Sequence, residues 1–131
     1  MSKRFSLGKY ERIKSRAEMT HVFESGESVF SHPFKLIYTP INRADNLLNN
    51  LKFGVTVPKR IHNKAVTRNK IKRLVRETYR LSKPELAASI GSEDQAYALM
   101  YIYVSKDLPE LVSLRNQVDK LHRKWLKKIL S

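Results

Sequence analysis

The sequence predicts a single domain of the α/β or α+β class, in which helices pack against one small mixed sheet. Three observations support this prediction. Apolar residues recur at helical spacing in three segments, β-prone runs lie between those segments, and 131 residues suffice for only one modest core. The predicted order is helix, strand, strand, helix, strand, helix, with a further strand possible before the central helix.

The chain begins with a basic, aperiodic segment, residues 1–14, which we expect to be an arm that is ordered only where it packs. A helix is predicted to follow, because Ser15 and Glu18 have the spacing of a capping box and Gly26 is a typical helix terminator. One face of this helix carries three bulky residues: Met19, Val22 and Phe23.

Two alternating segments predict strands before the central helix. The first, Phe34–Tyr38, places Phe34, Leu36 and Tyr38 on one face and Lys35 and Ile37 on the other. A polar loop is predicted over residues 42–50. The second strand, Lys52–Val57, alternates in the same way and ends at Pro58.

A helix of about 17 residues is predicted over the segment NKAVTRNKIKRLVRETYR, Asn63–Arg80. At 100° per residue, one face should pack on the sheet; it comprises Ile71, Leu74, Val75, Thr78, Leu81 and Ser82, with Tyr79 at its border. The opposite face is a cationic ridge about 18 Å long. Its residues are Arg68, Asn69, Lys72, Arg73, Arg76 and Arg80.

The remainder of the chain predicts a linker, a strand and a helix. Residues 82–95, SKPELAASIGSEDQ, contain Pro84 and Gly91 and are predicted to form the linker. The β-prone run Ala96–Val104 should be a strand covered on both faces or nearly so. Pro109–Leu130 predicts an amphipathic helix whose apolar stripe is Leu111, Leu114, Val118, Leu121, Trp125 and Ile129.

The charge of the chain indicates a polyanionic partner. There are 26 Lys and Arg against 12 Asp and Glu, a formal net charge of +14, and such an excess is typical of nucleic-acid binding. A membrane surface is the rival partner, but neither a basic amphipathic anchor nor an apolar span of about 20 residues is present. With no signal peptide and no cysteine, we expect a soluble cytoplasmic protein.

The cationic ridge is best interpreted as a phosphate-binding surface. Within the helix only Glu77 is available to pair with seven cations, whereas a merely solvated face, the alternative, usually mixes both signs of charge. Arginine offers a planar fork of donors to phosphate oxygens and lysine a mobile point charge. A DNA recognition helix would normally follow another helix, but this one follows a strand, so helix-turn-helix binding is disfavoured.

No active site is predicted in the chain itself. A two-metal nuclease needs clustered carboxylates, but here the acidic residues are scattered and no D-x-D or E-x-x-H pattern occurs. The histidines have no motif around them, although His62 lies beside the basic segment and could touch RNA. The cations of the last helix, Arg123, Lys124, Lys127 and Lys128, could supplement RNA contacts or simply be solvated.

These residues resemble a known family signature. VPKR followed by KAVTRNKIKRLVRETYR is similar to the bacterial ribonuclease P protein subunit, whose central motif reads R-N-R-x-K-R-x-x-R. The matching positions are Arg68, Asn69, Lys70, Lys72, Arg73 and Arg76, and the preceding Lys-Lys pair of the family is Lys59-Arg60. Lys70 departs from the usual arginine and loses the bidentate fork. The likeness extends over roughly residues 7–128.

The resemblance implies an αβββαβα sandwich, a fold shared with a domain of a ribosomal protein, with a left-handed βαβ crossover around the basic helix. General rules would have favoured the opposite hand, because such crossovers are right-handed in about 98% of proteins. It also implies one domain over residues 1–131, acting as a monomer when alone.

The resemblance further implies a function in tRNA processing. The partners would be the catalytic RNA of ribonuclease P, which uses Mg²⁺ bound to RNA, and precursor tRNA, with no DNA and no membrane. RNA binding would fall to Lys59, Arg60, Lys64, Arg68, Asn69, Lys70, Lys72, Arg73, Arg76 and Arg80. A cleft for the 5′ leader of the substrate would be lined by Met19, Phe23, Leu36 and Tyr38, with additions from Tyr101 or Tyr103. The alternatives are a structural protein of the ribosome or of another ribonucleoprotein, and an autonomous nuclease.

Overall fold

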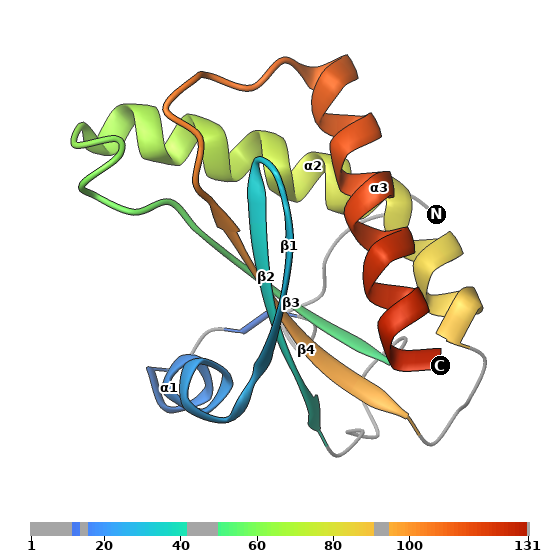
Figure 1. The fold of residues 1–131 in the computed structure, drawn as a ribbon. Coiled ribbons are helices and arrows are strands. Elements are labelled where there is room, and N and C mark those ends of the chain that lie inside the picture. The colour runs from blue at the N-terminus through green and yellow to red at the C-terminus, as the bar shows by residue number, and fades with distance from the viewer. Residues whose placement is uncertain (1–11, 14–15, 42–49, 91–94, 131) are drawn as a thin grey trace, which may run out of the picture.

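The computed structural model describes residues 12–13, 16–41, 50–90 and 95–130 (Figure 1). Three helices and four strands follow one another in the order αβββαβα, as the resemblance implied. They are α1 (Arg16–Ser25), β1 (Glu27–Ser31), β2 (Phe34–Ile41), β3 (Leu51–Thr56), α2 (Ala65–Ile90), β4 (Ala96–Tyr103) and α3 (Leu111–Leu130). No helix in these ranges combines the length and apolar character needed to cross a membrane.

The strands form one mixed sheet in the order β1-β2-β4-β3. The β1–β2 and β2–β4 pairs are antiparallel, with Leu36 opposite Val29 on one side and Tyr101 on the other. Strands β3 and β4 are parallel, with Phe53 opposite Leu99, and α2 is the crossover that joins them. The sheet therefore has β1 and β3 at its two edges.

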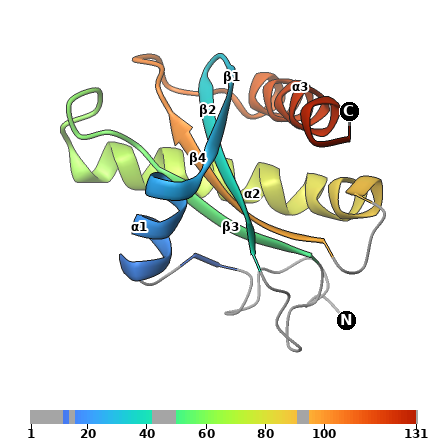
Figure 2. The same ribbon diagram turned by 60° about the horizontal axis from the view of Figure 1, so that its bottom comes forward.

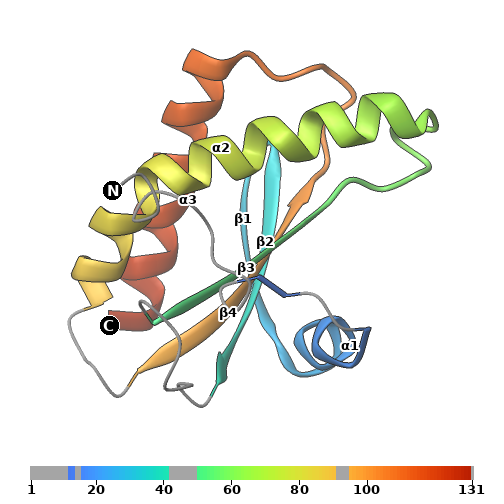
Figure 3. The ribbon, with the colours of Figure 1, turned by 180° about the vertical axis from the view of Figure 1, so that it is seen from behind.

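The helices cover the two faces of the sheet unequally. Helices α2 and α3 pack together over one face, and α1 lies on the other (Figures 2 and 3). The larger core lies beneath α2 and α3, and it contains Trp125, Tyr79, Phe34 and Leu36, all 0 or 1% exposed. A smaller cluster lies beneath α1 and contains Ile13, Val22, Ile37, Ala98 and Met100.

Strand β1 is the element that periodicity did not locate. It has five residues, directly follows the first helix, and buries only Val29 and Ser31. Gly26 makes the tight connection possible, because a Cβ there would lie 2.4 Å from the carbonyl oxygen of Val22 and 2.5 Å from Ile37 Cγ2. A side chain at this position would clash with the end of α1 and with β2.

The predicted linker over residues 82–95 is wrong for its described part, because α2 continues to Ile90 with Pro84 inside it. Proline in a helix costs roughly 3 kcal/mol, since a hydrogen bond is lost and the ring clashes with the preceding turn. Leu86 and Ile90 prolong the buried stripe, and Ser82 Oγ donates to Asp119 of α3 over 3.2 Å. Packing against α3 offsets the local cost. The predicted helix breaker Gly91 lies outside the described residues.

Two predicted packing residues are instead largely exposed. Leu81 is 43% exposed while Tyr79, placed at the border of the apolar face, is buried. The stripe is centred nearer Tyr79 because its ring stacks on Phe53 with centroids 4.4 Å apart. Leu111 is 51% exposed because it is the first residue of α3, where the helix has not yet reached the core.

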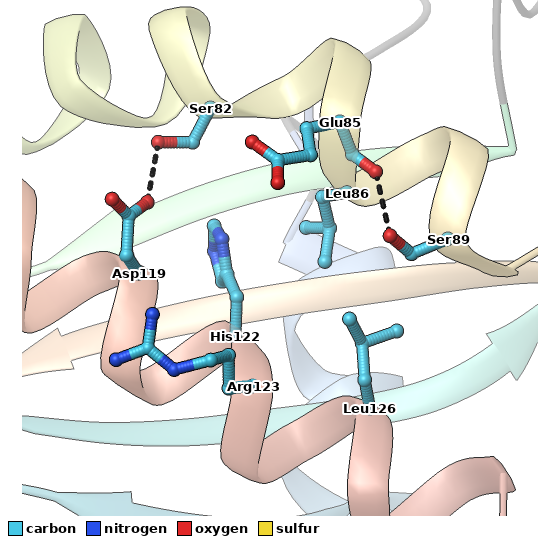
Figure 4. Close-up of a pocket in the computed structure, with 8 residues that line it drawn as sticks. All are labelled: Ser82, Glu85, Leu86, Ser89, Asp119, His122, Arg123 and Leu126. Atoms are coloured by element: carbon cyan, nitrogen blue, oxygen red, sulfur yellow. Dashed lines mark hydrogen bonds between the residues drawn. The ribbon is translucent and has the colours of Figure 1, made fainter.

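Polar side chains of α2 and α3 line a pocket between the two helices, with Ser82 and Glu85 from α2 and Asp119 and His122 from α3 (Figure 4). His122 Nε2 lies 2.6 Å from the hydroxyl of Tyr101, and both side chains are buried. Burial lowers the pKa of His122 to about 4, against the weaker opposing effect of the Asp119 carboxylate. His122 is therefore neutral at pH 7, and its Nε2 can accept a hydrogen bond from the Tyr101 hydroxyl.

This histidine should make the fold sensitive to acid. Its pKa is lower in the folded chain than the ordinary 6.5, so the unfolded chain binds more protons between pH 6.5 and 4. Stability should therefore be full above pH 6.5 and decline as the pH falls through this window, by roughly 3 kcal/mol in total at 1.4 kcal/mol per unit. Urea unfolding as a function of pH measures this decline.

The matched comparison is between two histidine substitutions. His122→Gln should flatten the decline between pH 6.5 and 4, whereas His21→Gln, which removes an exposed imidazole, should leave it intact. An unchanged decline in His122→Gln would assign the acid sensitivity to other groups.

Candidate nucleic-acid interface

The outer face of α2 brings a set of polar side chains together into one shallow groove. Its lining residues are Val66, Asn69, Lys70, Lys72, Arg73 and Arg76. They lie opposite the buried stripe of Ile71 and Val75, which holds this side of the helix away from the sheet. The cations at positions 72, 73 and 76, which the helical spacing placed together, thus share one surface, and Lys70 from the family motif lies beside them.

Three further predicted cations precede the helix. Lys59 and Arg60 lie in a turn closed by the backbone N–H groups of Ile61 and His62, which donate to the carbonyl of Pro58 at 3.1 Å. Lys64 comes directly before the first helical residue, and all three side chains are exposed. They extend the positive surface beyond the first turn of α2.

Arg68 makes backbone contacts that the sequence did not predict. It lies beside the buried stripe rather than opposite it, and its Nη1 donates to the carbonyl oxygens of His62 at 3.0 Å and Asn63 at 2.9 Å. These bonds hold the loop before α2 against the first turn of the helix. Arg68 keeps further donors, so its RNA contact stays a prediction beside this structural role.

His62 connects the same loop to the end of β4. Its Nε2 donates to the carbonyl oxygen of Ser105 over 2.8 Å, and its ring lies beside that of Tyr103. Tyr103 donates to the carbonyl of Asp107, whose N–H donates to Ser105 Oγ. The start of the basic helix is therefore fixed to the β4–α3 loop. The sequence placed His62 beside the motif but did not show this role.

Arg80 is partly neutralised at the far end of the ridge. Its guanidinium donates to both carboxylate oxygens of Glu77, one turn earlier. This bond lowers the pKa of Glu77 and raises the pKa of Arg80. The pair is exposed, so phosphate can compete for the guanidinium, but Arg80 is less available than Arg73.

Arg12 adds a cation that the sequence analysis did not assign to the site. The chain at Arg12 and Ile13 runs beside β3, where the Ile13 N–H donates to the Phe53 carbonyl over 2.8 Å. Burial lowers the pKa of Arg76, and the positive charge of Arg12 lowers it further. Two like charges thus lie near each other, an arrangement that an anion between them would stabilise. The rest of the predicted arm, residues 1–11 and 14, lies outside the described residues.

The predicted leader cleft is wrong as a single site. Met19 and Phe23 lie on α1 and are 37% and 46% exposed. The other members, Leu36, Tyr38, Tyr101 and Tyr103, are at most 4% exposed and belong to the core beneath α2 and α3. The sheet separates the two groups, because alternating residues of one strand point to opposite faces. Tyr38, for example, packs edge-on against Trp125 of α3.

Metal-ligating side chains do not cluster in the part of the chain that the structure describes. Nowhere in residues 12–13, 16–41, 50–90 and 95–130 do three His, Asp or Glu side chains come close enough together to hold an ion.

Comparison with known proteins identifies the family. The sequence model of the family described as Ribonuclease P matches residues 7–130. This chain belongs to the ribonuclease P protein family. Its function in tRNA 5′ processing follows from that membership. The ribonuclease P protein components of Porphyromonas gingivalis and Syntrophus aciditrophicus are each 33% identical to it over 88% of this chain, and over 83% and 95% of their own lengths.

Solved structures of the ribonuclease P family have the same fold. The Staphylococcus aureus RNase P protein has a TM-score of 0.63 and 25% identity, covering 86% of this chain and 93% of its own. The Thermotoga maritima RNase P protein has a TM-score of 0.65, covering 86% of this chain and 96% of its own, at 23% identity. The α+β sandwich with its small mixed sheet is thus the fold of this family.

Two substitutions should separate phosphate contact from positioning in this ribonuclease P protein. Arg73→Ala should weaken binding to ribonuclease P RNA and make the salt dependence shallower by about one unit, because the phosphate contact predicted for Arg73 would be lost. His62→Ala should weaken binding several-fold with the salt slope unchanged, because it loosens the start of α2 without removing a cation. Affinity titrations from 50 to 300 mM salt measure both. A shallower salt slope in His62→Ala would instead indicate that His62 contacts a phosphate group directly.

Proposed function

We propose that this chain binds the catalytic RNA of ribonuclease P through the outer face of α2 and assists removal of the 5′ leader from precursor tRNA. The observation that carries the proposal is the groove of Asn69, Lys70, Lys72, Arg73 and Arg76, held outward by the buried stripe of the same helix. Membership of the ribonuclease P protein family indicates which RNA this surface would bind.

Phosphate is the chemistry that fits this groove. Arg73 and Arg76 offer planar donor forks, and Lys70 and Lys72 offer point charges one helical turn or less away. Asn69 can donate and accept, so it suits a sugar hydroxyl or a base edge. Contacts of this kind release counterions from RNA, which gives affinity without sequence preference.

In this proposal the chemical step belongs to the RNA. The groove on α2 presents ammonium and guanidinium groups to the RNA, and these positive groups repel divalent cations. Mg²⁺ sites in proteins instead use carboxylates and water. Mg²⁺ would therefore be bound by RNA, and the protein would strengthen the assembly by neutralising phosphate charge around it.

Reconstitution tests this function directly. Adding the protein to ribonuclease P RNA and precursor tRNA at low Mg²⁺ should raise the rate of mature 5′-end formation over RNA alone, because the protein supplies positive charge that Mg²⁺ otherwise provides. Three assemblies are compared: RNA alone, protein alone, and both. RNA binding without stimulation would favour the structural ribonucleoprotein alternative, and cleavage by protein alone would favour an autonomous nuclease.

For the 5′ leader we propose the α1 side of the sheet, in place of the cleft that the sequence suggested. Met19 and Phe23 keep large exposed apolar areas on α1, and the exposed Lys35 side chain lies on the same face of β2 as Ile37. Lys52 of β3 pairs with Glu18 of α1 over 2.5 Å, which ties the helix to this face. Exposed apolar side chains beside cations suit unstacked bases of single-stranded RNA.

Phe23→Ala tests this placement. Loss of one stacked base is worth about 1–3 kcal/mol, so affinity of the reconstituted enzyme for precursor tRNA should fall about 5- to 150-fold, with binding of mature tRNA unchanged. Leu108→Ala, which truncates a side chain 56% exposed in the β4–α3 loop, is the matched control. Equal losses of affinity for precursor and mature tRNA would mean that Phe23 does not contact the 5′ leader. Tyr38→Ala should instead destabilise the fold, since Tyr38 is a core residue.

A further inference from the structure

A second positive groove lies at the edge of the sheet opposite to the α2 side. Helix α2 covers the β3 edge and α3 covers the β1 edge, so the two helices present their outer faces in different directions (Figure 2). Between β1 and α3 is a groove lined by Ser28, Val29, Phe30, Lys124, Lys127 and Lys128. None of these lining residues carries a carboxylate.

The lysines of this groove are held against the backbone of β1. Lys124 Nζ donates to the Phe30 carbonyl over 2.6 Å, and Lys128 Nζ donates to the Ser28 carbonyl over 3.1 Å. An ammonium group has three N–H donors, so Lys124 can also donate to another acceptor once this bond is made. Lys128 Nζ in addition lies 5.7 Å from the centroid of the Tyr38 ring. The contacts therefore fix the positions of the charges without consuming them.

The outer face of α3 continues the positive charge beyond the groove. Between positions 120 and 128, a length of about 12 Å, it carries Lys120, Arg123, Lys124, Lys127 and Lys128, all exposed. Asp119 is the one carboxylate of the whole helix, and it is engaged by Ser82 of α2 and by Arg115. Lys127 and Lys128, in the last turn, favour the helix dipole, but the other cations gain nothing of this kind, and like charges three and four residues apart repel.

Two other classes of partner fit this groove poorly. A protein strand that paired with the β1 edge would need its outward carbonyls, and Lys124 and Lys128 already occupy those of Phe30 and Ser28. A membrane would need the apolar face of α3, but Leu114, Val118, Leu121 and Trp125 are 0% exposed in the core. A polyanion that is recognised by its charge alone remains.

We infer that the β1–α3 groove binds the phosphate backbone of a second segment of ribonuclease P RNA. This inference rests on the proposed function of the chain, and it makes the protein bivalent for one RNA. Because α2 and α3 pack against each other, the two surfaces are held at a fixed separation, and a large RNA that reaches one surface raises the effective concentration of its other segment at the second. Recognition through ammonium groups implies no sequence preference.

Lysine footprinting tests the inference on the full-length chain. The protein, free and bound to ribonuclease P RNA, is acylated briefly, and modification of each lysine is measured by mass spectrometry. Protection of Lys70 and Lys72 reports on the α2 surface, protection of Lys124 and Lys127 reports on the groove, and Lys106, in an exposed loop, is the reference. The inference expects protection of both sets. Protection of the α2 set alone overturns the inference and leaves the proposed function standing, whereas protection of neither overturns both.

Two further arms assign the source of the anion. Groove protection that appears only after precursor tRNA is added would mean that the groove binds the substrate. Protection by vesicles of phosphatidylglycerol but not by RNA would mean that the groove binds a membrane. Either result overturns the inference.

A charge reversal provides the independent check. Among the described residues Lys127 makes no hydrogen bond or ion pair, so Lys127→Glu should lower thermal stability only slightly, through loss of a favourable charge in the last turn of α3. It should weaken RNA binding and make the salt slope shallower by about one unit. Lys106→Glu makes the same charge change outside the groove and should leave the slope unaltered. Equal effects of the two substitutions would mean that only net charge matters, which overturns the groove as a site.

Discussion

The structure depends on one contact above the others, the packing of the aromatic stripe of α2 on the middle of the sheet. Tyr79 stacks on Phe53 and meets the ring of Tyr101 edge-on, and Tyr101 in turn bonds to His122 of α3. This chain of contacts joins β3, β4, α2 and α3. Because α2 is also the crossover between two parallel strands, its rotation about its own axis is fixed by the same rings. That rotation decides which of its side chains face solvent.

The orientation of α2 then separates the chain into surfaces with different chemistry. One side of the sheet is sealed by α2 and α3, so aromatic residues there act as core. The α1 side is covered by a single short helix and keeps apolar side chains exposed. Exposed cations lie outside both layers, on the outer faces of α2 and α3, whereas Lys83 of α2 is only 3% exposed. Keeping most of the positive charge at the surface avoids the desolvation cost of burying it.

Periodicity predicted which residues share a face, but not what covers that face. The alternation of Phe34, Leu36 and Tyr38 is as predicted, and so is the ridge of Asn69, Lys72, Arg73 and Arg76. Whether the tyrosines line a cleft or a core depends on where α3 docks, which is a long-range contact that no local pattern encodes. The docking of α3 also stabilises α2 beyond Pro84, so that the helix continues to Ile90. The loop before α2 binds Arg68 through the carbonyls of His62 and Asn63. Strand β1 was too short for its alternation to be distinguished from a turn.

The supports at the two ends of the basic half of α2 have a thermodynamic consequence. Ser82 holds one end to α3, and His62 and Arg68 hold the other end to the loops. Between these supports the backbone cannot bend or fray without breaking side-chain bonds, so the spacing of the cations is set before any ligand arrives. A preorganised surface loses less conformational entropy on association than a flexible basic tail of equal charge. In the proposed interface the rigidity of α2, as well as its charge, would therefore contribute to affinity.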